Sequence, residues 1–152
     1  MMRKIIYILL IIFGVLLIGF GLKQSININK FIKLSKVFIN GKEIKVEIAD
    51  DFYEIKQGLS DRGNLSENQG MLFVFGDKNE RVFWMKNMNF PLDVIWIDDD
   101  KIVQIDKNCE PGGENPEKQY YSKTLVNYVL EVNGGFADKN NIKIGDKVII
   151  EL

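Results

Sequence analysis

The sequence predicts a mainly β domain, either an antiparallel β-sandwich or a small barrel with one short helix, preceded by an N-terminal transmembrane helix. About eight segments have the length and residue pattern of strands, and turn residues separate them. One segment, Phe52–Gln57, has the start and stop signals of a short helix. Because strands joined by short turns pair with antiparallel neighbours, these features favour a sandwich or barrel.

The N-terminal segment predicts a membrane helix. Ile5–Leu22 is an uninterrupted run of 18 uncharged residues, preceded by Arg3 and Lys4 and followed by Lys23. At about 1.5 Å per residue the run is roughly 27 Å long, enough to cross a thin hydrocarbon core. The small residues of Gly19–Gly21 leave a second interpretation open, in which the segment is a cleaved signal peptide and the domain is secreted.

The chain divides into a membrane anchor or signal segment over residues 1–24, a linker over 25–35 and a β-rich domain over 36–152. Arg3 and Lys4 favour a cytoplasmic N-terminus, whereas the lysines that follow the apolar run favour the reverse. Because large domains cross the membrane largely regardless of their charge, we expect the domain to lie on the extracytoplasmic side.

The first part of the domain predicts a hairpin and a helix. Lys36–Asn40 and Lys42–Ala49 alternate apolar and polar residues, and Asn40-Gly41 between them suits a turn with positive φ. Asp50-Asp51 then offers an N-cap to Phe52–Gln57, and Gly58 ends that helix.

The middle of the chain predicts a buried strand and a second hairpin. Gly70–Phe75 is apolar on both alternating faces, which is typical of a strand covered on both sides. In Arg81–Asp98, two apolar runs, Val82–Met85 and Leu92–Ile97, flank a polar tip, so we expect a tight hairpin.

The C-terminal part predicts three more strands, Lys101–Asp106, Val126–Asn133 and Lys147–Glu151. Two Pro and two Gly mark Asn108–Lys123 as the longest loop, and Phe136–Asn140 is long enough for one helical turn.

Composition excludes several kinds of function. The chain has no His and a single Cys, Cys109, which excludes Ser–His and Cys–His nucleophile pairs, His-based zinc sites and an intrachain disulfide. Residues 25–152 hold 17 basic and 21 acidic residues, with no basic stripe for nucleic acid. We therefore expect no nucleic-acid partner, no metal site and no cofactor.

A series of short motifs resembles a known family. The motifs are Gly58-Leu59 with Arg62, Gly70-Met71-Leu72-Phe73, Trp84-Met85-Lys86-Asn87, Pro91-Leu92-Asp93, Tyr128–Val132 with Gly134-Gly135, and Gly145-Asp146. In this order they resemble the family called domain of unknown function 192, small bacterial and archaeal proteins that are often exported or membrane-anchored. The resemblance runs from about Ile44 to Leu152 and implies a β-rich, sandwich-like fold, but no activity.

The chain also departs from the family pattern. Ser60 stands where the family usually has Met, and Met88 where it usually has Thr. Members often carry a Cys pair in the long loop, where this chain has only Cys109, so the resemblance implies no metal or redox role for that loop here.

The candidate binding residues gather around the expected hairpin tip. They offer an aromatic face, cations, an amide and carboxylates, and they are Arg62, Trp84, Lys86, Asn87, Asp93 and Glu131. In one interpretation Trp84 belongs to the core and Lys86 pairs with Asp93 across the turn to fix the strand register. In the other, Trp84 stacks on a ligand whose polar groups the remaining side chains orient.

Three functions remain open. The first is a membrane-anchored domain that binds a small polar ligand, such as a saccharide or an envelope fragment. The second is a structural or accessory envelope protein without a ligand. The third is a hydrolase: Asp93 and Glu131 both lie among apolar residues, where carboxylates tend to have raised pKa values, and a pair of them facing one cleft could act as general acid and base. No catalytic residue is assigned.

Overall fold

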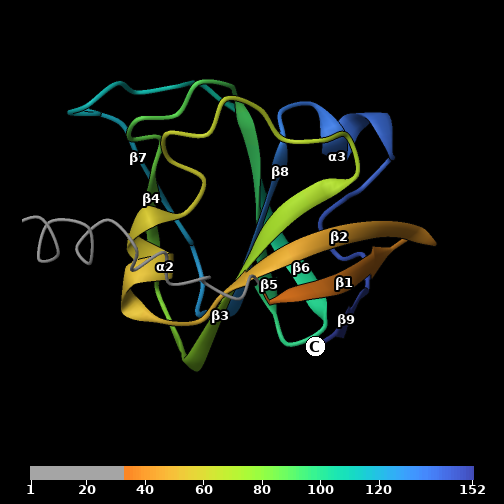
Figure 1. Cartoon of the computed structure of the whole chain (residues 1–152). Coiled ribbons are helices and arrows are strands. Elements are labelled where there is room, and N and C mark those ends of the chain that lie inside the picture. The colour runs from red at the N-terminus through yellow and green to blue at the C-terminus, as the bar shows by residue number, and fades with distance from the viewer. Residues whose placement is uncertain (1–32) are drawn as a thin grey trace, which may run out of the picture. The chain divides into compact units, whose positions relative to one another are not determined.

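The structure, a computed structural model, describes residues 33–152, which belong to one compact unit. The expected membrane segment over 5–22, and all but the last residues of the expected linker, lie outside the described residues. In the described part of the chain, no helix is both long and apolar enough to span a bilayer. The elements, shown in Figure 1, are β1 Leu34–Ile39, β2 Lys42–Ala49, α2 Phe52–Gln57, β3 Gln69–Asn79, β4 Val82–Trp84, β5 Leu92–Asp98, β6 Lys101–Cys109, β7 Gln119–Tyr121, β8 Val126–Asn133, α3 Phe136–Lys139 and β9 Val148–Glu151.

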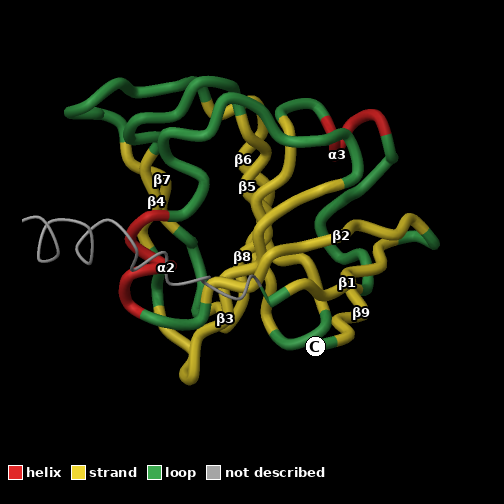
Figure 2. The backbone as a smooth tube through the Cα atoms, in the orientation of Figure 1, coloured by secondary structure: helices red, strands yellow, loops and turns green. Residues whose placement is uncertain are grey.

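Seven strands form one curled sheet in the order β6-β5-β8-β3-β2-β1-β9, and β4 and β7 form a separate two-stranded ribbon. Neighbouring strands are antiparallel except β2 and β3, which run parallel. The sheet curls into a half-barrel, and its two edges meet where Lys101 of β6 bridges Lys147, just before β9. The predicted mainly β class is confirmed, because the residues that the structure describes form nine strands and two short helices (Figure 2).

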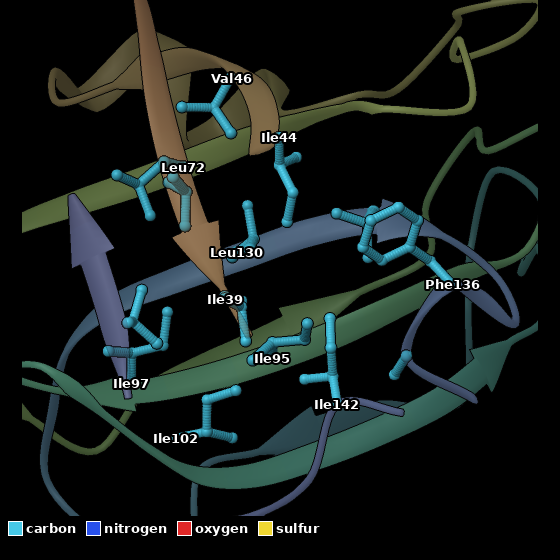
Figure 3. Close-up of a cluster of buried hydrophobic side chains, with 14 residues drawn as sticks. Ile39, Ile44, Val46, Leu72, Ile95, Ile97, Ile102, Leu130, Phe136 and Ile142 are labelled. Atoms are coloured by element: carbon cyan, nitrogen blue, oxygen red, sulfur yellow. The ribbon is translucent and has the colours of Figure 1, made fainter. Parts of the chain in front are cut away.

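The inner face of the curled sheet holds the first core cluster (Figure 3). Alternate residues of each strand point into it, as the two-residue period of a strand requires. Burying an aliphatic side chain of this kind is worth about 1.5–3 kcal/mol, so this cluster supplies much of the stability of the sheet. Its labelled members are Ile39, Ile44, Val46, Leu72, Ile95, Ile97, Ile102, Leu130, Phe136 and Ile142.

The other face of the sheet carries a second core cluster over β3, β5 and β8. The segment after α2 covers it with Leu59, the ribbon covers it with Tyr120, and the chain after β4 covers it with Met85 and Met88. Because both faces are covered here, β3 is buried on both sides over 70–73, as the sequence predicts. This second cluster surrounds the candidate site.

Two local predictions are confirmed. Asn40 and Gly41 both have positive φ and connect Ile39 to its partner Lys42, as a two-residue hairpin turn requires. The side chain of Asp51 accepts a hydrogen bond from the backbone N–H of Glu54 and caps α2, which ends at Gly58.

The expected hairpin over Arg81–Asp98 is wrong. β4 pairs with β7, far along the chain, whereas β5 pairs with β6 and β8. After β4 the chain does not turn back to pair with β5. Instead it contacts the long loop: the carbonyl of Met85 accepts a hydrogen bond from the N–H of Gly112, and the N–H of Asn87 donates to the carbonyl of Gly113, both at 2.8 Å. The expected loop over 108–123 is interrupted by a strand, because β7 lies within it.

Candidate functional site

Two carboxylates are buried in the middle of the sheet, Asp93 on β5 and Glu131 on β8. The two strands are neighbours, and their register pairs Asp93 with Val132 and Glu131 with Val94. Since successive residues of a strand point to opposite faces, Asp93 lies on the face of the first core cluster and Glu131 on the face of the second. The two carboxylates therefore do not face one cleft, as the hydrolase hypothesis requires, and we do not propose that function.

Asp93 is fully satisfied by the backbone. One oxygen accepts from the N–H groups of Asn108, at 2.9 Å, and Gly135, at 3.0 Å, and the other accepts from Ala137 at 2.8 Å. Gly135 has a φ of 81°, so a residue without a Cβ suits this turn into α3. Asp93 thus ties β5, the end of β6 and the start of α3 together, and the expected pair with Lys86 is not formed.

Glu131 has the opposite environment. Its side chain is 4% exposed, and no described residue donates a hydrogen bond to it or forms an ion pair with it. Its neighbours across the sheet are Met71 on β3 and Val94 on β5. Burial disfavours the charged form and raises the pKa of Glu131 to about 8, which confirms the expectation for a carboxylate among apolar residues.

Glu131 lines a pocket between α2, β3 and β4. The pocket has a volume of about 170 Å³. Gly58, at the end of α2, forms part of its wall: a Cβ there would lie 3.3 Å from Cζ of Phe73 and 4.0 Å from Oε2 of Glu131. The backbone of Gly58, with φ 50° and ψ −134°, also favours glycine. The absence of a side chain at this position keeps the approach to Glu131 open.

The remaining walls are largely aromatic. Phe73, Phe83 and Trp84 all line the pocket, and the rings of Phe73 and Phe83 meet edge to face with centroids 4.7 Å apart. Trp84 is 45% exposed, so it stands at the opening, whereas Phe73 is buried. Polar groups at the pocket come from the segment after α2 and from α2 itself, through Ser60 and Lys56.

Of the six predicted site residues, the structure brings two, Trp84 and Glu131, into this pocket. Arg62 forms a two-pronged ion pair with Glu47, with N–O distances of 2.5 and 2.6 Å. Lys86 accepts a hydrogen bond from the Ser60 hydroxyl through its backbone carbonyl at 2.8 Å. Asn87 has a φ of 51° and serves as a turn residue.

Sequence reasoning missed the pocket residues of other segments. These are Ile55, Lys56, Gln57, Gly58, Leu59, Ser60, Phe73, Val82, Phe83 and Met88. The sequence shows Gly58 as a helix stop, and nothing in it indicates that the residue packs against Phe73. The pairing of β2 with β3 and of β4 with β7 joins segments that are distant in the sequence, and these pairings place the pocket residues together.

Cys109 lies in the second core cluster and is buried. Burial raises the pKa of its thiol to about 11, against a weaker lowering by a hydrogen bond with Tyr120. Because the thiolate is the reactive form, this cysteine is unreactive at neutral pH.

The fold and the pocket define a class of protein: a curled β-sheet domain with a small aromatic pocket that contains a buried carboxyl group, which has no ion-pair partner among residues 33–152. The family model of DUF192, described as "Uncharacterized ACR", matches residues 35–150. The chain belongs to this family, and the resemblance noted from its motifs is confirmed.

Two solved structures are similar to this chain. One, from Sinorhizobium meliloti 1021, is described as a candidate transcription regulator; it is 32% identical, with a TM-score of 0.73, over 78% of this chain and 95% of that one. The other, a protein of unknown function from Novosphingobium aromaticivorans DSM 12444, is 30% identical, with a TM-score of 0.73, over 79% of this chain and 87% of that one. The comparison with curated proteins finds no match.

Proposed function

We propose that this protein is a membrane-anchored, extracytoplasmic binding protein whose pocket at Glu131 receives a small polar ligand, such as one unit of a saccharide or of an envelope fragment. The observation that carries the proposal is Glu131 itself, a buried carboxyl group that lines an open pocket and has no hydrogen-bond partner among the described residues. Because the carboxyl group of Glu131 opens to the pocket, its oxygens can accept hydrogen bonds from a ligand bound there.

Stability does not explain Glu131. Burial disfavours the charged form of Glu131 and raises its pKa to about 8, and no described residue offsets that cost with a hydrogen bond or an ion pair. The neighbours of Glu131 across the sheet, Met71 and Val94, show that an apolar residue would fit the same row. A ligand that donates hydrogen bonds would supply the missing partners.

The size and walls of the pocket limit the ligand. A cavity of about 150 Å³ in another protein holds one benzene ring, so the pocket of about 170 Å³ accepts a single ring or a group of similar size. The exposed indole of Trp84 offers a flat apolar surface on which a ring can stack. A sugar unit combines such a flat face with hydroxyl donors for Glu131.

Exposed apolar side chains near the start of the domain support its proposed attachment to a membrane. The described chain begins at Lys33, whose side chain pairs with Asp50 at 2.7 Å, directly before α2. Around this point Leu34, Phe52 and Tyr53 are all more than 70% exposed. Apolar and aromatic side chains of this kind are favoured where a protein meets the bilayer interface.

The ligand is sought with the full-length chain in lipid nanodiscs, titrated with monosaccharides and envelope fragments while tryptophan fluorescence and heat are recorded. We expect a ligand whose affinity falls at least about fivefold in Trp84→Ala, since stacking on an aromatic ring is worth about 1 kcal/mol or more. Tyr121→Ala is the matched control, because Tyr121 is similarly exposed but does not line the pocket. An affinity that is unchanged in Trp84→Ala, or no binding at all, would favour the structural envelope role instead.

The location is checked separately with a C-terminal tag. Protease added to spheroplasts is expected to remove the tag, whereas the tag in inside-out vesicles should be protected. The reverse pattern would place the domain in the cytoplasm, and a protein found in the medium without residues 1–24 would show the secreted alternative.

The charge of this chain does not favour a nucleic-acid partner. Residues 25–152 carry a net charge of −4, and a DNA-binding surface depends on basic residues that neutralise phosphates.

A further inference from the structure

We infer that the ligand of this pocket carries a positively charged primary amine, which binds the Glu131 carboxylate while the ring that bears it contacts the aromatic walls. This inference rests on the proposed function and narrows its substrate class to ring compounds that carry a primary alkylamine. It follows from the donors, the charges and the walls that surround Glu131.

The first step is the balance of donors. An ionised carboxylate offers about four acceptor positions, and the described residues fill none of those of Glu131. A primary ammonium group brings three N–H donors and a compact charge. A hydroxyl group brings one donor and no charge, so it leaves most of the acceptor capacity of Glu131 unused.

The second step is the balance of charge. Among the described residues that line the pocket, the one charged side chain besides Glu131 is Lys56 on α2. Lys56 is exposed, and its ammonium lies 5.9 Å from the ring centroid of Phe52, another exposed residue of α2. From β3 and β5, Glu131 faces Met71 and Val94, which carry no charge. When Glu131 ionises, burial opposes its charge and no described residue offsets that charge.

The third step is the nature of the walls. Phe73, Phe83 and Trp84 line the same pocket as the carboxyl group. The faces of aromatic rings carry negative partial charge and attract organic cations, with tryptophan the strongest. An anionic ligand would be repelled by Glu131 once that carboxyl group is ionised. A metal ion is also a poor fit, because the described residues hold no group of three acidic or cysteine side chains that could ligate one.

The proton balance predicts how binding depends on pH. The empty pocket keeps Glu131 largely protonated at neutral pH, because its pKa is about 8. An ammonium ion binds the carboxylate form, so its binding releases this proton. Alkylamines resemble the lysine side chain, with a pKa of about 10.4, and stay charged throughout. Affinity for an amine should therefore rise from about pH 6 to about pH 8 and then level off.

The test compares benzylamine with benzyl alcohol, which have the same size and ring and differ in the charged group. The full-length chain in nanodiscs of neutral lipid is titrated with each while tryptophan fluorescence and NMR shifts are recorded. At pH 8 we expect benzylamine to bind at least about tenfold more tightly, because charge-assisted hydrogen bonds are about twice as strong as neutral ones. Glu131→Gln should remove this preference, whereas Glu114→Gln, at an exposed loop position, should keep it.

The outcomes separate the two proposals. Equal binding of both compounds, lost together in Trp84→Ala, would overturn the amine inference and leave the pocket as a binding site. A preference for benzyl alcohol, or no binding of benzylamine at pH 8, would overturn it as well, while the saccharide titration decides the proposed function independently. If Glu131→Gln fails to fold, the comparison at pH 6 and pH 8 on the natural chain gives the same answer, since a preference that does not grow with pH contradicts a role for the carboxylate.

Discussion

Asp93 and Glu131 are both acidic, both buried and on neighbouring strands, yet they lie on opposite faces of the sheet and differ in their hydrogen bonds. Asp93 receives three backbone N–H groups and closes the turn into α3. Glu131 receives no hydrogen bond from the described residues and lines a pocket. Two buried acids on adjacent strands therefore differ in the number of hydrogen-bond donors that the described residues offer them.

The largest expected effect is at Asp93. Asp93→Ala removes the acceptor of three backbone N–H groups, and we expect a loss of at least about 3 kcal/mol in the free energy of unfolding, measured with urea. Asp93→Asn keeps one acceptor oxygen and should lose less. If both variants unfolded like the natural chain, the assignment of Asp93 as the structural acid would be wrong.

The next effect is the pH dependence that Glu131 gives to stability. Its pKa is about 8 in the folded chain and near 4.5 when unfolded, so between these values the folded state holds a proton that the unfolded state has lost. The stabilisation is complete below about pH 4.5 and is lost as the pH rises through about 8, at up to about 1.4 kcal/mol per pH unit.

The difference between variants isolates this contribution. As the pH rises from 5 to 8, the free energy of unfolding of Glu131→Met, measured with urea, should increase relative to that of the natural chain. Glu117→Gln, at an exposed position, serves as the control and should run parallel to the natural chain. A constant difference between Glu131→Met and the natural chain would mean that Glu131 has an ordinary pKa.

A smaller effect is expected at the pocket wall. Gly58→Ala places a Cβ against Phe73 and forces a side chain on a backbone with φ 50°, which should cost about 1–3 kcal/mol and narrow the pocket. Gly63→Ala is the matched control, since a Cβ there meets nothing within 4 Å. Unfolding in urea measures the first effect, and titration with benzyl alcohol measures the second.

The smallest effect is at Arg62, one of the predicted binding residues. Arg62→Lys breaks the two-pronged contact with Glu47, and because the pair is partly exposed we expect a loss of about 1 kcal/mol or less, decreasing with salt. Ligand affinity should stay unchanged, because Arg62 does not line the pocket. A fall in affinity without a fall in stability would return Arg62 to the binding site.

The parts of the fold that local chemistry decides could be predicted from the sequence. The turn at Asn40-Gly41, the cap at Asp51 and the strand over Val126–Asn133 all depend on residues near one another in the chain. The partner of β4 could not, because β7 lies more than thirty residues further on and is only three residues long. A short apolar run shows that a strand exists, and not which strand it joins.

The candidate site could also be predicted only in part, because some of its features are local in the sequence and others depend on strand register. Glu131 stands out in the sequence as an acid between Leu130 and Val132, and Trp84 as an aromatic beside polar residues. That Asp93 faces away from Glu131 depends on the register between β5 and β8, which a shift of one residue would reverse. That Lys86 and Asn87 serve the backbone depends on contacts with distant segments.

The parallel pairing of β2 with β3 has a consequence for how this pocket can change. Parallel neighbours need a long crossover, and here the crossover is residues 50–68, which carry α2, Gly58 and Ser60. One wall of the pocket is thus a surface connection, whereas Glu131 belongs to the central sheet. Connections accept substitution and changes of length more readily than strands do. A different ligand preference could therefore be built by exchanging residues 50–68 as one cassette, with the sheet and its buried acid left in place.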